Sequence, residues 1–213
     1  EQNALAEEDL DRAAQRVSAL MLAAQSNSER SEVDFDAHHD LARKCAAEGA
    51  VLLKNQNRCL PFKTARSLAV IGAFAEIPRI QGAGSSQVNA TRIEKPLEIF
   101  RKMIGAKVTY APGFDPELAE DNPGLIEEAV AIAEKAEQVL ILAGLPPLFE
   151  AEGFDRTTLK QPAQIDRLID AVSTANPNCA VILSNGSPIE MPWLDQVPAV
   201  LETYLGGQAG AEA

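Results

Sequence analysis

Five short apolar runs, separated by segments with helical spacing, constrain the fold of this chain more than any other feature. The runs cover residues 68–71, 108–110, 139–143, 180–183 and 199–204. Strands that are apolar on both faces and separated by long crossovers are typical of a parallel sheet with helices on both sides. The sequence therefore predicts an α/β fold, with a mostly parallel sheet of about five to six strands sandwiched between helices.

Three of the segments between these runs carry apolar residues at helical spacing. One helix is expected at residues 97–104, with Gly105 as its C-cap. A second begins at Pro123, behind Asn122 as its N-cap, and a third covers residues 165–172. These helices are the crossovers that the parallel sheet requires.

The chain opens with a separate amphipathic helix, because apolar residues recur at helical spacing from Leu10 to Ala24. Turn-forming residues then break the period. We expect residues 1–34 to be a linker helix leading from a missing upstream domain, and residues 35–213 to form the α/β domain. Only a glycine-rich turn follows the last predicted strand, where a helix should come, so we expect this domain to be truncated at its C-terminal end.

Charge excludes two classes of partner. The chain has 31 acidic residues against 19 Lys and Arg, giving a formal net charge of −12. Nucleic acids and anionic membranes both require a cationic face. No apolar run approaches the ~20 residues of a membrane-spanning helix. We therefore expect neither nucleic acid nor membrane as a partner.

Cysteine and histidine usage predicts no metal site. Cys45, Cys59 and Cys179 have no C-x-x-C spacing and are odd in number, which argues against a disulfide framework or a zinc knuckle. His38 and His39 are adjacent, so on a helix they point about 100° apart and cannot bind one ion together. We expect them to lie at a helix start instead.

Three polar loops should meet at one edge of the sheet, because the carboxyl ends of parallel strands share an edge and ligands bind there. They are the glycine-rich loop (residues 81–87), the Glu152 loop (residues 149–156) and the third loop (residues 184–188). A dinucleotide fingerprint would need Gly or Ala three residues after Gly84, but Gln87 stands there. The sequence thus predicts no nucleotide and no other cofactor.

Carboxylate chemistry is the reaction type that remains. No G-x-S-x-G elbow is present, and both histidines lie in the leading part of the chain, so a Ser-His-Asp triad is not supported. The apolar neighbours Phe149 and Phe154 could desolvate a glutamate of the Glu152 loop and raise its pKa. Glycoside cleavage is the large reaction class that needs such an acid opposite a second carboxylate.

Six segments together resemble the second domain of glycoside hydrolase family 3, the family of β-glucosidases, β-xylosidases and N-acetylglucosaminidases. The similarity extends from about residue 35 to the end. The segments are HDLAR (39–43), AEGAVLLKN (47–55), AVIG (69–72), GAGSS (82–86), EGFDR (152–156) and NGSPIEMPW (185–193). The resemblance implies an α/β sandwich domain that follows a TIM-like barrel and packs against it, with the active site at the junction.

The resemblance also implies roles for individual residues. The barrel supplies the catalytic Asp nucleophile, and the glutamate matching Glu152 is the acid/base. Gly84, Ser85 and Ser86 lie in the loop at the pocket mouth and are expected to bind substrate. Glu150, two residues before Glu152, shares its face in an extended loop and is the alternative acid; we expect it to be a rim residue that touches substrate.

Two further residues of the resembling segments are expected to be structural. Arg156, together with its neighbour Asp155, should tie the Glu152 loop down through hydrogen bonds. Trp193 should anchor the core or an interdomain contact.

The expected function is that of an acid/base-supplying domain in a retaining, exo-acting β-glycosidase, a β-glucosidase, that removes terminal non-reducing sugars. The expected partners are a carbohydrate substrate and the upstream barrel of the same polypeptide. A lone acid cannot perform double displacement, so this chain by itself is predicted to be inactive. The alternative is a non-catalytic carbohydrate-binding or structural module of the same fold.

Overall fold

The computed structural model describes residues 5–26, 32–63, 66–117, 122–153 and 155–213. The chain forms two compact units, Glu1–Asp34 and Phe35–Ala213. The first contains helix α1 (Glu7–Ser26), which agrees with the predicted amphipathic helix. Phe154, which the sequence placed beside the glutamates, lies outside the described residues. No helix in the described part of the chain is long and apolar enough to span a membrane.

The second unit is built around a six-stranded sheet with the order β1-β6-β5-β4-β2-β3. All neighbouring pairs are parallel except β1 and β6. The predicted α/β class and mostly parallel sheet are therefore confirmed. The strands are β1 (Val51–Asn55), β2 (Leu68–Ile71), β3 (Val108–Ala111), β4 (Gln138–Gly144), β5 (Cys179–Ser184) and β6 (Ala199–Glu202).

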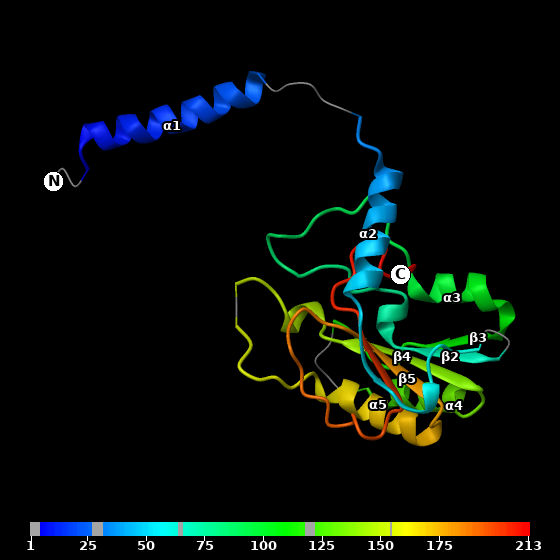
Figure 1. Cartoon of the computed structure of the whole chain (residues 1–213). Coiled ribbons are helices and arrows are strands. Elements are labelled where there is room, and N and C mark those ends of the chain that lie inside the picture. The colour runs from blue at the N-terminus through cyan, green and yellow to red at the C-terminus, as the bar shows by residue number, and fades with distance from the viewer. Residues whose placement is uncertain (1–4, 27–31, 64–65, 118–121, 154) are drawn as a thin grey trace. The chain divides into compact units, whose positions relative to one another are not determined.

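Helices cover both faces of this sheet. In Figure 1, α2 (Phe35–Gly49) and α3 (Pro96–Ile104) lie on one side, and α4 (Pro123–Ala133) and α5 (Ala163–Ala175) lie on the other. The predicted caps are present, since the Asn122 side chain accepts a hydrogen bond from the Gly124 amide and Gly105 ends α3 with φ +73°. The short 3₁₀ helices are η1 (Gln56–Arg58), η2 (Ala73–Ala75), η3 (Gly105–Lys107) and η4 (Pro147–Phe149).

Strand β1 was missed by the sequence analysis, whose first predicted strand begins at residue 68. Helix α2 ends at Gly49, and Val51 pairs with Glu202 in the antiparallel register of β1 and β6. Periodicity cannot distinguish a short apolar run in a strand from one in a helix. As an edge strand, β1 leaves the side chains of Val51, Leu52 and Leu53 exposed.

The core lies on both faces of the central strands. Every residue of β4 is buried, and Phe74 meets Phe114 edge-on with ring centroids 5.1 Å apart. Trp193 is 2% exposed, and its indole Nε1 donates a hydrogen bond of 2.9 Å to Asp166 Oδ1 on α5. The expectation that Trp193 is a core anchor is confirmed.

The order of the strands creates a crevice between β2 and β4. The chain continues from β2 outward to β3 at one edge, and from β4 in the opposite direction to β5 and β6. The strand order therefore reverses between β2 and β4, and such a reversal point is where open α/β sheets bind ligands. The glycine-rich loop and the Glu152 loop follow these two strands.

Glycines end both strands at this crevice because the neighbouring backbone comes too close for a side chain. Gly144 has φ +133°, and a Cβ there would lie 2.2 Å from the Ser184 carbonyl oxygen. Gly72 has φ +119°, and its Cβ would lie 2.0 Å from the Leu142 carbonyl oxygen. Gly72 thus lets the end of β2 pack closely against β4, and Gly144 lets the end of β4 pack closely against β5.

Gly144→Ala should destabilise the fold by at least about 3 kcal/mol, because the new Cβ combines backbone strain with overpacking. Gly49→Ala is the matched control, since a Cβ at Gly49 has nothing within 4 Å and alanine favours a helix. Urea unfolding followed by circular dichroism measures both variants. Equal stability of the two would contradict the close approach at Gly144.

Candidate active site

The three predicted loops meet at the carboxyl edge of the sheet and form an open hollow of about 590 Å³. This hollow brings Ser85, Ser86, Glu150 and Glu152 together, and Gly84 lies directly against Glu152. Its remaining lining residues are Gly82, Ala83, Phe149, Ala151, Asp155, Arg156, Gly186, Ser187 and Leu205.

The carboxylate of Glu152 is exposed and is held by Ser85. The Ser85 amide donates a hydrogen bond of 2.9 Å to Glu152 Oε2, and the Ser85 hydroxyl donates to the same oxygen. Hydrogen bonds to an ionised carboxylate favour that form. The Ser85 hydroxyl, followed by the Ser85 amide, accordingly lowers the pKa of Glu152 below its usual value. The sequence analysis expected the opposite shift, because it assumed that apolar neighbours would desolvate this side chain.

Backbone contacts join the Glu152 loop to the glycine-rich loop. The Glu152 amide donates to the Ala83 carbonyl oxygen at 3.1 Å, and Ala83 and Ala151 form an isolated parallel bridge. Gly84 makes this approach possible, because a Cβ at that position would lie 2.6 Å from the Glu152 Cβ. Its φ of +105° also disfavours any other residue.

Glu150 lies in a different environment from Glu152, although only one residue separates them. Its side chain is 14% exposed and accepts hydrogen bonds from the Gly186 amide at 2.8 Å and the Ser187 hydroxyl at 2.7 Å. The guanidinium of Arg79, itself buried, lies 3.5 Å from Glu150 Oε2. Glu150 therefore joins the Glu152 loop to the third loop directly, and to the glycine-rich loop through Arg79.

Arg79 connects the glycine-rich loop to the strand ends. Its Nε donates to the Leu145 carbonyl oxygen at 2.8 Å, and its Nη1 donates to the Gln81 carbonyl oxygen at 3.1 Å. The sequence analysis did not single out this residue. A buried arginine paired with a loop glutamate 71 positions later leaves no local signal in the sequence.

Arg156 holds the far side of the Glu152 loop, as expected. Its Nη1 donates to the Ser187 hydroxyl at 2.8 Å and to the Pro188 carbonyl oxygen at 3.0 Å. Ser187 therefore links Glu150 and Arg156. Asp155 lines the hollow but is exposed.

Beneath the hollow lies a buried carboxylate that the sequence analysis also missed. Glu202, 7% exposed, accepts hydrogen bonds from the Asn185 side chain at 3.2 Å and the Tyr204 amide at 2.8 Å. Burial raises the pKa of Glu202, and the charge of Glu150 acts in the same direction, while these hydrogen bonds oppose the rise. Glu202 supports the third loop from below.

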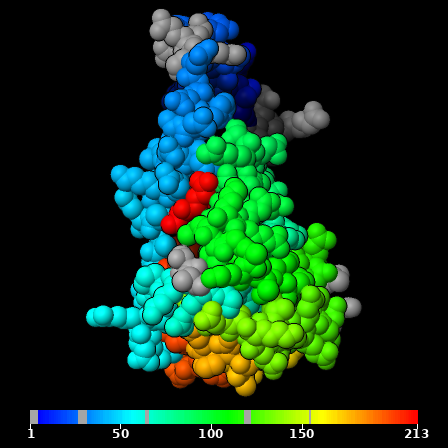
Figure 2. Space-filling view, turned by 90° about the vertical axis from the view of Figure 1, so that its right-hand side faces the viewer, coloured from blue at the N-terminus to red at the C-terminus, as the bar shows by residue number. Residues whose placement is uncertain are grey.

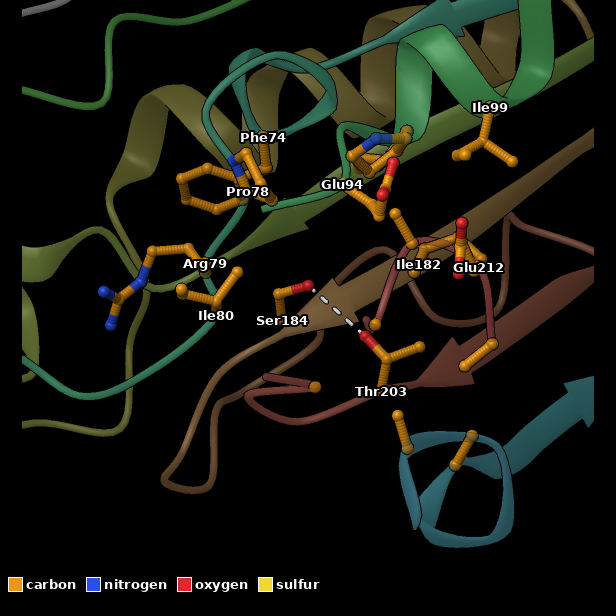
Figure 3. A pocket seen from close by; sticks show the side chains of 18 of the residues that line it. Phe74, Pro78, Arg79, Ile80, Glu94, Ile99, Ile182, Ser184, Thr203 and Glu212 are labelled. Carbon is orange, nitrogen blue, oxygen red and sulfur yellow. Dashed lines mark hydrogen bonds between the residues drawn. The ribbon is translucent and has the colours of Figure 1, made fainter. Parts of the chain in front are cut away.

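A second cavity, of about 370 Å³, lies between α2, α3 and the sheet. Figure 3 shows Phe74, Ile99 and Ile182 around it, with Ser184, the last residue of β5, hydrogen-bonded at 3.3 Å to Thr203, which follows β6. Its lining is mainly apolar, whereas the carboxylates and hydroxyls of the predicted loops line the open hollow. The open hollow is therefore the candidate active site.

The C-terminal residues lie beside this second cavity, and Figure 2 shows them in red between α2 in light blue and the green segment that leads into α3. His39 Nε2 lies 3.2 Å from Glu212 Oε2, and its Nδ1 lies 2.8 Å from Gln208 Nε2. His39, Glu94 and Glu212 each place one potential metal-binding atom within 4.8 Å of the other two. Arg92 Nε already lies 3.9 Å from Glu94 Oε1 and supplies a positive charge there.

Comparison with known proteins identifies the family. The family profile "Glycosyl hydrolase family 3 C-terminal domain" matches residues 50–213. The chain belongs to glycoside hydrolase family 3. The resemblance found in the sequence is thereby confirmed, and residues 50–213 correspond to the C-terminal domain of the family.

Two curated relatives align with 96% of the chain. They are thermostable beta-glucosidase B of Acetivibrio thermocellus, at 45% identity, and an exo-alpha-(1->6)-L-arabinopyranosidase of Bifidobacterium longum, at 40%. Among solved structures, a Bifidobacterium adolescentis GH3 beta-glucosidase superposes on 99% of the chain with a TM-score of 0.87 and 39% identity. The chain spans 28% of the length of each curated relative and 31% of that structure.

Gly84→Ala should separate the two loops of this family 3 domain, because its Cβ would collide with that of Glu152 and its backbone strain would cost about 1–3 kcal/mol. The amide NMR resonances of Ala151 and Glu152 should move. Gly82→Ala is the control, since its Cβ has nothing within 4 Å. If both variants leave the two resonances in place, the loops do not meet at Gly84.

Proposed function

We propose that this chain is the acid/base-supplying domain of a retaining, exo-acting β-glycosidase, a β-glucosidase that removes terminal non-reducing sugars. The observation that carries this proposal is the position of Glu152. Its loop is fixed to the glycine-rich loop, and its carboxylate lies exposed in the hollow at the reversal point of the sheet. The names of the relatives support the reaction class, and their greater length supports further domains in the same polypeptide.

In the proposed mechanism, the nucleophile comes from an upstream TIM-like barrel. Glu152 gives its proton to the glycosidic oxygen as the bond to the sugar breaks and the nucleophile bonds to the anomeric carbon. Glu152 then takes a proton from water as the water oxygen displaces the nucleophile. The two carboxyl groups must stand about 5–5.5 Å apart for this sequence.

The other predicted site residues contribute to binding in this proposal. Ser85 and Ser86 offer hydroxyl groups to the sugar from the glycine-rich loop, and Gly84 lets that loop approach Glu152. Glu150 touches substrate only from the wall, because Gly186, Ser187 and Arg79 already occupy its oxygens.

In the proposed mechanism, the pKa of Glu152 must be raised by the rest of the enzyme and by the bound sugar before Glu152 can act as a general acid near neutral pH. In this chain, hydrogen bonds from Ser85 favour its ionised form. A second carboxylate about 5 Å away would disfavour that form, as would desolvation by a bound sugar. Both effects raise the pKa toward the value at which a general acid works near neutral pH.

The chain by itself should not hydrolyse an aryl β-glucoside, since it carries the acid but no nucleophile placed across the sugar. Release of the aryl group, followed by absorbance with increasing substrate, tests this expectation. Saturable hydrolysis that persists after further purification would contradict it.

In a complete enzyme containing this domain and its barrel, Glu152→Gly should reduce turnover of an aryl β-glucoside by about 10²–10⁴-fold. Azide should restore turnover with formation of the β-glucosyl azide, because the small anion fits the space left by the carboxylate and attacks the glycosyl-enzyme. Product analysis by mass spectrometry measures the rescue.

Glu150→Gly is the matched control for this experiment. Removing its carboxylate releases the contacts with Gly186, Ser187 and Arg79, so activity should fall without recovery in azide. Rescue of Glu150→Gly in place of Glu152→Gly would exchange the roles of the two residues. If Glu152→Gly hardly changes turnover, the acid lies elsewhere and this domain shapes the pocket without taking part in the chemistry.

A further inference from the structure

We propose that Ser85 is a positioning residue for Glu152, and that Oε1 of Glu152 is the oxygen that gives and takes the proton. This inference rests on the proposed acid/base role of Glu152. It adds which oxygen of the carboxylate transfers the proton. It also adds that the glycine-rich loop positions Glu152 besides contacting the sugar.

The two oxygens of Glu152 have different surroundings. Oε2 accepts hydrogen bonds from both the amide and the hydroxyl of Ser85. Within the described ranges, no group donates a hydrogen bond to Oε1. One oxygen is thus committed to holding the side chain, while the other is available to substrate.

The position of Ser85 is itself fixed by hydrogen bonds on both sides of the glycine-rich loop. The Gln81 side chain closes the glycine-rich loop by pairing with the Val88 amide at 3.0 Å and the Val88 carbonyl oxygen at 2.9 Å. The Ala83 carbonyl oxygen accepts from the Glu152 amide. Ser85 therefore approaches Oε2 from a loop that is anchored on both sides.

Other charged groups in the hollow are less suited to orienting Glu152. Glu150, Asp155 and Arg156 are the titratable residues that line it with Glu152. Glu150 bonds to Gly186 and Ser187, and Arg156 bonds to Ser187 and Pro188. Asp155 carries the same charge as Glu152. Ser85 is the described residue that donates hydrogen bonds to the carboxylate.

This arrangement serves both halves of the proposed reaction. With a proton on Oε1, Oε2 can still accept from Ser85, so the acid points its proton into the hollow. After that proton moves to the leaving oxygen, the two donors stabilise the ionised carboxylate that must activate water. The Ser85 hydroxyl keeps lone pairs that can accept from a sugar hydroxyl at the same time.

The direct test is the titration of Glu152 in this chain, followed by ¹³C NMR of labelled glutamate carboxyl groups, with Glu152→Gln to assign the resonance. Ser85→Ala should raise the pKa of Glu152, because one of the two donors is lost. Ser86→Ala is the matched control and should leave the pKa unchanged, since the structure gives Ser86 no hydrogen bond to Glu152. An unchanged pKa in Ser85→Ala would overturn the proposal.

Two variants of similar shape test whether a pKa change arises from loss of the hydroxyl or from a disturbed loop conformation. Ser85→Thr keeps the hydroxyl and should retain a pKa close to that of the unmodified chain, whereas Ser85→Val lacks the hydroxyl and should raise it. Equal pKa values in this pair would show that the hydroxyl does not act on Glu152 and would also overturn the proposal.

In the complete enzyme, Ser85→Ala should extend the alkaline limb of the kcat/KM profile to higher pH, because the acid stays protonated longer. If azide rescues Glu152→Gly but Ser85→Ala does not shift the profile, the positioning role of Ser85 is wrong while the acid/base role of Glu152 stands. A raised pKa in the chain without azide rescue would defeat the acid/base role and leave the Ser85 contact as a structural one.

Discussion

The reversal of strand order between β2 and β4 decides where this domain can carry chemistry. The two strands are paired along their length, yet the chain leaves them in opposite directions across the sheet. The loops that follow them begin side by side, because Gly72 lies against Leu142 of β4, while Gly144 in turn lies against Ser184 of β5. Ser85 comes from one of these loops and Glu152 from the other, so their meeting follows from the topology of the sheet.

Two glutamates with one residue between them acquire distinct tasks from this geometry. Glu150 turns to the wall, where a buried guanidinium and two donors of the third loop satisfy it. Glu152 remains exposed and meets only Ser85 among the described donors. Truncating the first is a structural change, because it leaves a buried charge on Arg79 uncompensated. Truncating the second removes a group that the fold hardly uses, which is the expected condition of a residue kept for chemistry.

The sequence predicted what depends on local pattern and missed what depends on distant contacts. The parallel sheet followed from runs that are apolar on both faces, and helices α3 to α5 followed from spacing and caps. β1 was missed because five residues carry too little periodicity. Glu152 and Ser85 were found through the family resemblance, yet the direction of the Glu152 pKa shift was wrong, because the responsible donor lies 67 residues away. Arg79 and Glu202 were missed for the same reason.

The contact between the two loops is made largely by main-chain atoms, at Ala83, Ala151 and the amide of Ser85. Main-chain hydrogen bonds do not depend on which side chain a position carries. Positions 83 and 151 can therefore drift during evolution, or be randomised in a library, while Glu152 keeps its place. Gly84 is the exception that must be left untouched. The side chains at positions 83 and 151 can thus be varied separately from the main-chain contacts that hold Glu152.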